Sequence, residues 1–369
     1  MRIGIDAKQY FTGPVSSRVV LQNLLPELFS LYPEQEWVIF LDRKDEGLSF
    51  PFRGENIHFQ YVWADNNQLS NLLLLPAHLR RLHVDVMVFL TFPSLFSRIP
   101  SIAFIHDVLF RDYPQFFSLK ERLYFLPQAL LTRRATRLAV TTEFVAGDLL
   151  RYRYSRSRSL IDRVPLGVND NFKPAAAHDE GVLGRVRSKF GLPDRYLLYV
   201  GRLNVRKNIE TLLRALLLMQ DRDIPLVIVG KEDSKAPDLR ELLSMPEIAR
   251  RTVLTGGMTD EEVRATYAMA MVFCFPSFAE GFGLPPLEAM ASGVPAVVAN
   301  TTSLPEVCGD AAVYIDPSSP RSIAGALDTL LTDPLLYSRK RSAGLARVKA
   351  YSWARTGRAL MECITKALK

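Results

Sequence analysis

Residues 271–292 read MVFCFPSFAEGFGLPPLEAMAS: an apolar run, a glycine-rich turn, two prolines and a second apolar run. The run from Met271 to Ser277 predicts a short buried strand. The run from Pro286 to Ser292 predicts a helix with prolines at its start, where a missing N–H costs nothing. Because a strand that leads directly into a helix is the repeating unit of α/β proteins, this stretch predicts a parallel sheet flanked by helices.

Two carboxylates lie on either side of the turn. Glu280 and Glu288 are separated by seven residues, and the turn leaves the backbone N–H groups of Gly281, Phe282 and Gly283 free to bind an anion. Carboxylates beside such a site suit sugar hydroxyls, so the stretch predicts a ligand that carries both phosphate and sugar. A plainer alternative is that Glu288 only complements the helix dipole from the first turn.

A second segment supports the ligand-binding interpretation. Residues 201–208, GRLNVRKN, follow the apolar strand expected at 196–200, and Asn208 begins an amphipathic helix that runs to about Met219. Arg202 and Lys207 therefore lie in a strand-to-helix loop, where a planar guanidinium and a compact ammonium can hold a diphosphate together. The alternative is a pair of solvated surface cations.

Strands and helices alternate along the whole chain, which predicts parallel sheets covered on both faces. Two such blocks predict two doubly wound domains, joined near 167–184. Strands are expected at 2–6, 37–42, 57–62, 84–90, 102–106 and 138–142, then at 196–200, 226–229, 253–254, 271–275, 296–299 and 312–315. Helices of the first half are expected at 17–29, 69–82, 119–132 and 143–152.

The runs 199–215 and 276–317 resemble the donor half of the family 4 retaining glycosyltransferases. The resemblance implies the GT-B fold, in which two Rossmann-like domains face each other across a cleft. Residues 1–170 would bind the acceptor and residues 171–351 the nucleotide-sugar donor. The last helix, 352–369, would cross back to the first domain. Bacterial mannosyltransferases of surface polysaccharide assembly show the nearest resemblance.

The resemblance also implies roles for the residues of the second half. Arg202 and Lys207 would stabilise the charge that grows on the departing diphosphate, Glu280 would hold sugar hydroxyls, and Glu288 would bind the ribose. Backbone groups of the turn would assist the two cations. The donor-binding set is then Gly13, Arg202, Lys207, Glu280, Gly281, Phe282, Gly283, Leu284 and Glu288.

The first half contributes fewer candidates. His106 ends a predicted strand and, by the resemblance, points into the cleft as a catalytic residue with Arg202, Lys207 and Glu280; on the sequence alone it can equally be structural. Asp107 and Phe110 are acceptor candidates, although Asp107 can also only cap its loop. Gly13 would let the first loop approach the donor phosphate. The family usually has adjacent glycines there, whereas this chain has Gly13-Pro14.

The predicted reaction is retaining transfer of a hexose, foremost mannose from GDP-mannose, to a glycan or lipid-linked saccharide acceptor. Since two cations can do the work of a divalent metal, we expect no metal and no cofactor. A UDP-sugar or another GDP-sugar as donor, and a nucleotide-sugar epimerase or hydrolase of the same fold, remain alternatives.

Bulk properties set further limits. Apolar residues make up 48% of the chain and charged residues 23%, as in ordinary globular proteins. No apolar stretch is long enough to cross a bilayer. The three cysteines, Cys274, Cys308 and Cys363, show no metal-binding spacing and suit a reducing cytoplasm.

The net charge of +7 is shared by both halves: up to Asp170 there are 20 Lys and Arg against 17 Asp and Glu, and beyond it 26 against 22, but the first half holds one dense basic stretch. Between Lys120 and Arg163 there are 10 Lys and Arg against 4 Asp and Glu. A run of this kind is usually a solvated face. The functional alternative is contact of the stretch 133–163 with anionic lipid at the inner face of a membrane. No nucleic-acid-binding module accompanies it, so we expect no nucleic-acid partner.

Overall fold

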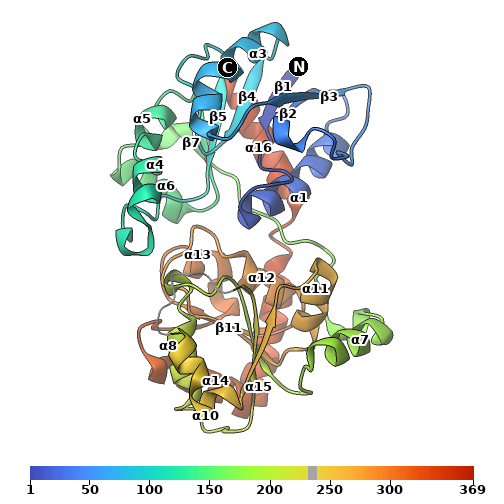
Figure 1. The fold of residues 1–369 in the computed structure, drawn as a ribbon, viewed down its shortest axis with the longest axis vertical. Coiled ribbons are helices and arrows are strands. Elements are labelled where there is room, and N and C mark those ends of the chain that lie inside the picture. The colour runs from blue at the N-terminus through green and yellow to red at the C-terminus, as the bar shows by residue number, and fades with distance from the viewer. Residues whose placement is uncertain (232–238) are drawn as a thin grey trace. The chain divides into compact units, whose positions relative to one another are not determined.

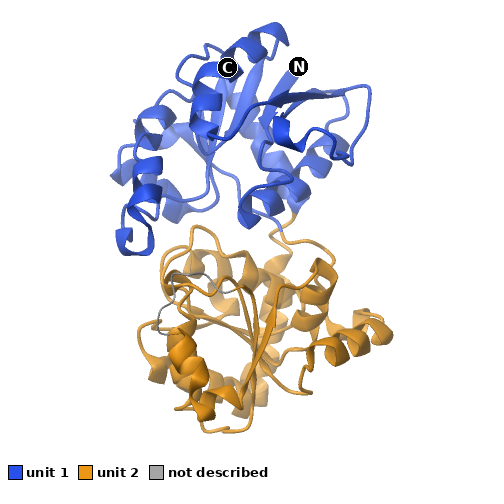
Figure 2. Ribbon diagram, viewed as in Figure 1, with its two compact units in different colours: residues 1–167, 353–369 blue, residues 168–352 orange. Residues whose placement is uncertain are grey.

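The computed structural model describes residues 1–231 and 239–369. It divides the chain into two compact units (Figure 2). The first comprises Met1–Gly167 together with Trp353–Lys369, and the second comprises Val168–Ser352. The sequence placed the corresponding boundaries after residues 170 and 351.

The first unit contains a seven-stranded parallel sheet in the order β3-β2-β1-β4-β5-β6-β7. Its core strands are apolar on both faces because helices cover both, as in doubly wound folds. The strands are β1 (Arg2–Asp6), β2 (Glu36–Asp42), β3 (Ile57–Val62), β4 (Val86–Leu90), β5 (Ser101–Ile105), β6 (Arg137–Val140) and β7 (Ile161–Arg163). The helices are α1 (Val15–Leu31), α2 (Asn67–Leu69), α3 (Leu75–Arg81), α4 (Leu119–Phe125), α5 (Gln128–Thr132), α6 (Glu143–Arg151) and α16 (Trp353–Ala367).

The last helix, α16, belongs to the first unit, where Figure 1 shows it beside α1. Gly357 lies so close to α1 that a Cβ added there would be 3.4 Å from a methyl group of Leu31. The hydroxyl of Thr356 donates to the carbonyl of Pro165 at 2.8 Å, and Lys366 pairs with Asp162 at 2.8 Å. The chain therefore returns to its first sheet after completing the second unit.

The second unit contains a six-stranded parallel sheet in the order β10-β9-β8-β11-β12-β13. Its strands are β8 (Leu197–Val200), β9 (Leu226–Val229), β10 (Thr252–Gly256), β11 (Val272–Phe275), β12 (Ala296–Ala299) and β13 (Val313–Ile315). Its helices are α7 (Glu180–Phe190), α8 (Ile209–Leu216), α9 (Leu239–Ser244), α10 (Pro246–Ala249), α11 (Asp260–Met269), α12 (Leu284–Ala291), α13 (Leu304–Cys308), α14 (Pro320–Thr332) and α15 (Pro334–Val348). Both sheets have the strand order of a doubly wound fold, which confirms the predicted fold class.

Two predicted helices are shorter and more broken than expected. The helix expected at 69–82 is divided by a wide π turn at Ser70–Leu74, just before Pro76. The helix expected at 119–132 is divided at Pro127, between α4 and α5. Proline lacks an N–H and crowds the preceding turn, so the regular hydrogen-bond ladder is interrupted at both places.

All three cysteines are buried and unpaired. Cys274 lies within β11, where the sequence predicts a buried strand. Among the described residues, no helix is long and apolar enough to cross a membrane.

Candidate active site at the carboxyl edge of the second sheet

A cluster of buried polar side chains in the second unit, Asn208, Ser277, Glu280 and Ser303, lies where its strand order reverses. β8 and β11 are neighbours in the sheet although β9 and β10 separate them in the chain. The loop after β8 carries Lys207, and the loop after β11 carries Glu280. Ligands of doubly wound sheets bind at this reversal, beyond the carboxyl ends of the strands.

Lys207 and Glu280 form a direct ion pair. Lys207 Nζ lies 2.6 Å from Glu280 Oε1, and the side chains are only 13% and 10% exposed. The hydroxyl of Ser277 donates to the same carboxylate oxygen at 2.5 Å. The structure thus brings together two residues that are 73 positions apart in the chain.

The surroundings keep Glu280 ionised. Burial by itself would raise the pKa of Glu280, but Lys207 and then Arg206 outweigh it and lower the pKa to about 2. Burial lowers the pKa of Lys207, and the charge of Glu280 opposes that shift. A buried charge pair of this kind needs hydrogen bonds to its remaining atoms, and Ser277 supplies one of them.

Arg206 joins the same cluster, although the sequence analysis did not select it. Its Nη1 lies 3.2 Å from Glu280 Oε2 and donates to the carbonyl of Ala279 at 2.6 Å. The available signal was its place beside Lys207 in an Arg-Lys doublet. An adjacent pair of cations alone does not indicate which of them faces inward.

The turn after Glu280 is held by the loop after β12. Glu280 N–H donates to the hydroxyl of Thr302 at 3.0 Å, and the hydroxyl oxygen of Ser303 lies 2.8 Å from the carbonyl of Glu280 and 3.1 Å from that of Phe282, so it can donate to either. Thr302 and Ser303 were also missed by the sequence analysis. Both are small polar residues in a loop, a pattern common to most turns.

The sequence analysis expected free backbone N–H groups in this turn at Gly281, Phe282 and Gly283, and the structure gives a set that overlaps it. Among the described residues, the N–H groups of Phe282, Gly283 and Leu284 have no hydrogen-bond partner. Gly283 has φ +97°, a backbone conformation that favours glycine, and a Cβ there would lie 2.6 Å from Leu304 Cδ2. These donors lie at the start of α12, where the helix dipole favours an anion.

Glu288 lies beyond the first turn of α12, so the interpretation as a dipole-complementing acid at the helix start is wrong. Its carboxylate accepts from the buried hydroxyl of Tyr267 at 3.0 Å. Burial raises the pKa of Glu288 to about 7, against the opposing effect of this hydrogen bond. The side chain is therefore about half-protonated near neutral pH.

Arg202 differs from Lys207 in its setting. It is exposed, and among the described residues its guanidinium has no partner. Its carbonyl accepts from the hydroxyl of Tyr199 at 3.0 Å, which fixes the backbone of the loop. Its charge lowers the pKa of Lys207, although burial and the other neighbours of that ammonium have larger effects. The role of Arg202 in diphosphate binding stays a prediction.

His106 and Asp107 lie at the carboxyl end of β5 in the first unit. The His106 Nε2 atom is buried without a hydrogen-bond partner among the described residues, and burial lowers its pKa to about 4. His106 is thus neutral at physiological pH. Asp107 Oδ1 accepts from Leu109 N–H at 3.2 Å and so caps its loop, which was the structural alternative for this residue.

The two remaining candidates of the first unit pack against their own chain. Phe110 is 7% exposed within an apolar cluster and stacks on Phe125 at 5.4 Å. A Cβ at Gly13 would lie 2.9 Å from the carbonyl oxygen of Gln9, so the loop itself requires glycine there. Their roles toward acceptor and donor stay predictions.

In the part of the chain that the structure describes, no three His, Cys, Asp or Glu side chains lie close enough together to hold a metal ion. The sequence does contain one Asp-x-Asp triplet, Asp221 to Asp223, a spacing often used for metals. Asp221 Oδ1 accepts from the N–H groups of Asp223 and Ile224 at 3.0 Å each. This carboxylate closes the turn before β9, at the amino edge of the sheet.

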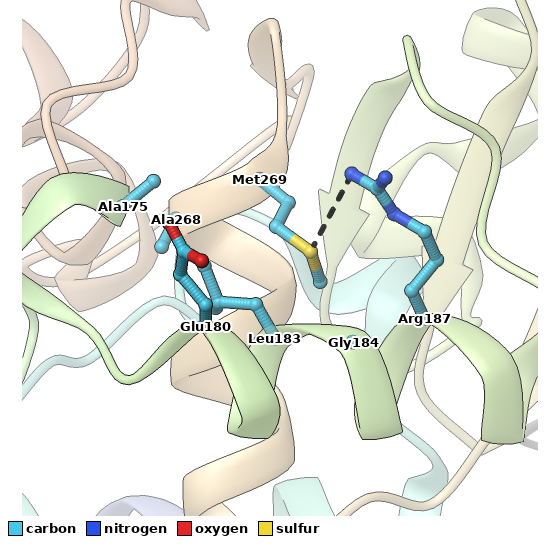
Figure 3. A pocket seen from close by; sticks show the side chains of 7 residues that line it. All are labelled: Ala175, Glu180, Leu183, Gly184, Arg187, Ala268 and Met269. Carbon is cyan, nitrogen blue, oxygen red and sulfur yellow. Dashed lines mark hydrogen bonds between the residues drawn. The ribbon is translucent and has the colours of Figure 1, made fainter.

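An open hollow of about 440 Å³ lies elsewhere in the second unit, between α7 and the end of α11 (Figure 3). It is lined by Glu180, Arg187 and Met269 among others, and the guanidinium of Arg187 contacts the sulfur of Met269 at 3.9 Å. Because α11 leads into the amino end of β11, this hollow is at the opposite edge of the sheet from Lys207 and Glu280.

Comparison with known proteins agrees with the geometry. The family model "Glycosyl transferases group 1" matches residues 185–347. The O-antigen chain mannosyltransferase B of Escherichia coli is 31% identical over 259 residues, which cover 69% of this chain and 67% of that protein. The serotype-specific mannosyltransferase WbdA of Escherichia coli is 34% identical over 191 residues, or 50% of this chain.

The match to WbdA covers only 23% of that longer protein. Among solved structures, HepE from Anabaena in complex with UDP-glucose superposes with a TM-score of 0.76 at 16% identity, covering 99% of this chain and 100% of that one. At an identity this low, the structural similarity is evidence for a shared fold only. The family match, the identity to mannosyltransferase B and the two doubly wound sheets together show that the chain belongs to the group 1 glycosyl transferases and has the GT-B fold.

Proposed function

We propose that this protein transfers a hexose, foremost mannose from GDP-mannose, to a hydroxyl group of a glycan or lipid-linked saccharide, with retention of the anomeric configuration. The observation that carries the proposal is the buried Lys207–Glu280 pair at the strand-order reversal, next to unpartnered N–H groups at the start of α12. The names of two relatives, an O-antigen chain mannosyltransferase and a serotype-specific mannosyltransferase, support the choice of sugar and acceptor.

The site offers complementary groups for each part of such a donor. Lys207, Arg202 and the N–H groups of the turn are suited to a diphosphate, and Glu280 to the sugar hydroxyls. Glu288 is suited to the ribose hydroxyls, toward which a carboxyl group can donate or accept. Binding through several such groups fixes the donor in one orientation.

In the proposed reaction, the bond between the anomeric carbon and the diphosphate oxygen breaks as negative charge grows on the diphosphate. Lys207 and the turn stabilise that charge, and the exposed guanidinium of Arg202 adds to this stabilisation. The acceptor oxygen bonds to the anomeric carbon from the face that the leaving group vacates. Its proton passes to the departing phosphate oxygen, which gives a glycoside and a nucleoside diphosphate.

His106 is proposed to meet the donor sugar as a neutral hydrogen-bonding group. Its lowered pKa supports a neutral ring throughout the physiological range. We further propose that fixed cations replace a divalent metal, so that neither metal nor cofactor takes part.

The test combines donor binding with turnover. Thermal shifts are measured against GDP-mannose, other GDP-sugars and UDP-sugars, since a ligand that binds only the folded protein raises its stability. The best donor is then incubated with saccharide acceptors in excess EDTA. We expect transfer with unchanged rate in EDTA. Release of free or isomerised sugar without an acceptor would instead identify a hydrolase or an epimerase, and magnesium dependence would refute the metal-free mechanism.

We also propose that the protein works in the cytoplasm, at the inner face of a membrane. In the stretch 133–163, several arginines are already paired, as with Arg151 and Asp112 or Arg158 and Glu143. The stronger support comes from the preceding segment. Four leucines there, at 119, 123, 126 and 130, are 57–66% exposed and follow a spacing of four, three and four.

This leucine row suits the boundary of a bilayer. The helical backbone continues from α4 through Leu126 and Pro127 into α5, so the row lies along one side. Exposed cations flank it at Lys120, Arg122, Arg133 and Arg134. Apolar side chains bordered by cations are typical of segments that lie in the interface of an anionic membrane.

Sedimentation with lipid vesicles tests this part of the proposal. The protein should pellet with vesicles rich in anionic phospholipid and much less with neutral ones. Leu123→Gln with Leu126→Gln should abolish pelleting. Leu335→Gln, which changes an 84% exposed leucine of the second unit, should leave it unchanged. Equal pelleting of all these proteins would contradict the membrane contact.

A further inference from the structure

Arg206 connects the two loops of the active site through both its backbone and its side chain. Its carbonyl accepts from Phe278 N–H at 2.9 Å and lies 3.2 Å from the hydroxyl oxygen of Ser277. Its guanidinium donates to the carbonyl of Ala279 at 2.6 Å and lies 3.2 Å from Glu280 Oε2. Each residue from 277 to 280 is thus in contact with Arg206.

The two oxygens of Glu280 have different partners. Oε1 is held by Lys207 and Ser277, and Oε2 is held by Arg206. The ammonium of Lys207 is a compact charge at the end of a flexible stem, so it can turn to a new anion. The guanidinium of Arg206 is fixed by its second bond, to Ala279, and has less freedom to leave.

This difference matters once a donor enters. In the proposed function, Lys207 turns toward the diphosphate, and Glu280 would then lose a cation while still buried. A buried carboxylate without a partner becomes protonated or moves. A second, fixed cation prevents both.

We propose that Arg206 is a positioning residue that keeps Glu280 ionised and correctly oriented for the sugar while Lys207 serves the diphosphate. This inference rests on the proposed function, which assigns the donor sugar to Glu280 and the diphosphate to Lys207. The contacts of Arg206 described above are to the loop and to Glu280, so this role does not require that Arg206 touch the donor.

Four groups facing Glu280 determine its charge: Lys207, Arg206, the hydroxyl of Ser277 and the buried phenol of Tyr199. Burial favours the protonated form of Glu280, and the two cations oppose it. Removal of Arg206 therefore raises the pKa of Glu280. An acid whose ionised form is required then loses activity at a higher pH than in the wild type.

The experiment compares Arg206→Gln, Arg206→Lys and a matched control, Arg321→Gln, which removes an exposed positive charge from the same unit. In Arg206→Gln we expect kcat with the best donor to fall roughly 10- to 100-fold, the range expected for a hydrogen bond to a charged group. The acidic limb of kcat/KM should move to higher pH. Arg206→Lys should restore the position of that limb, and the control should match the wild type.

Binding of GDP separates positioning from general damage. GDP has a diphosphate but no sugar, so its affinity should change less than twofold in Arg206→Gln, whereas a distorted site would bind it worse. If Arg206→Gln fails to fold, Arg206→Lys alone decides: an acidic limb shifted away from the wild-type position would overturn the proposal.

A readout without turnover distinguishes this inference from the function on which it rests. The carboxyl ¹³C signal of Glu280, assigned with Glu280→Gln, is titrated in the ligand-free proteins. We expect a higher midpoint in Arg206→Gln than in the wild type or the control. Equal midpoints would overturn the role of Arg206 even in an active enzyme, and a raised midpoint in a protein that transfers no sugar would instead refute the proposed function.

Discussion

At the residue scale, the candidate site holds two opposite charges as an ion pair. Ionised groups are costly to bury unless they are paired and hydrogen-bonded, and Lys207 and Glu280 meet both conditions. The same pairing keeps both side chains in place before a donor arrives. The donor then has to replace one ionic partner by another, which is a smaller change than creating a charge in a buried site.

The lysine is the first target for mutation. Lys207→Ala should reduce turnover by roughly 100-fold or more, as expected on loss of one preorganised charge stabiliser. The measurement is steady-state transfer with the best donor. Lys189→Ala, which removes an exposed lysine paired with Glu262, is the matched control and should keep full activity. Near-normal turnover of Lys207→Ala would reject the role of this residue.

Glu288 should make the stability of the ligand-free protein depend on pH. Its pKa is raised from 4.5 to about 7, so the folded state binds an additional proton between these values. Stability from this group is present below pH 4.5 and is lost as pH rises through 7. At about 1.4 kcal/mol for each pKa unit, the loss approaches roughly 3 kcal/mol.

Denaturant unfolding of the wild type and Glu288→Gln at pH 5 and pH 8 measures this effect. The glutamine variant should lose clearly less stability between the two pH values, because it has no proton to release. A parallel loss in both proteins would contradict the raised pKa of Glu288.

The sequence predicted those site residues whose chemistry is unusual for their position. A carboxylate pair around a glycine turn and two cations after a strand selected Lys207, Glu280 and Glu288. Arg206, Thr302 and Ser303 were not predicted, because their importance comes from contacts across the fold. Whether a cation faces inward depends on the conformation of a loop, which no periodic pattern encodes.

At the element scale, strands were predicted where apolar runs are short and bounded by turn residues. β1, β3, β9 and β12 have the predicted bounds. β7 was missed because Ile161, Asp162 and Arg163 form a three-residue edge strand with two charged members. The helix expected at 69–82 was predicted too long, since its apolar spacing continues through a π turn that a periodic pattern does not reveal.

The turn that begins α12 is predicted to be sensitive to a single methyl group. Gly283→Ala places a Cβ 2.6 Å from Leu304 in a backbone conformation at φ +97°. The strain should cost about 1–3 kcal/mol and weaken donor binding by displacing the turn. Thermal unfolding and donor titration measure both effects.

Gly325→Ala is the matched control for this substitution. Gly325 lies within α14 with no atom near the position of a new Cβ. Alanine there should stabilise the protein by about 0.5–1 kcal/mol, as expected for a helix interior. If both alanine variants behave alike, the special conformation of Gly283 has no role.

At the scale of the whole molecule, the order of the elements along the chain does not match their division into two units, because the last helix belongs to the first unit. The first sheet is covered by the last helix, α16, which the contacts of Gly357, Thr356 and Lys366 tie to the first unit. A substitution that weakens the packing of α16 should therefore destabilise the first unit, although the helix follows the second unit in the chain.

Hydrogen exchange measured by mass spectrometry tests this assignment. Leu360→Ala in α16 should cost about 2–5 kcal/mol, the usual range for a buried leucine, and should speed exchange in peptides from residues 1–167. Leu327→Ala in α14 should instead act on residues 168–352. Faster exchange of the second unit in Leu360→Ala would contradict the assignment of α16.

The central claim is that a donor diphosphate is held at the carboxyl edge of the second sheet by Lys207 and the turn of α12. A crystal structure with GDP-mannose, or with whichever donor binds best, tests it most directly. We predict a diphosphate oxygen within hydrogen-bonding distance of Lys207 Nζ and of N–H groups in Phe282 to Leu284, with the sugar at Glu280. A donor bound elsewhere, with the Lys207–Glu280 pair undisturbed, would contradict the account.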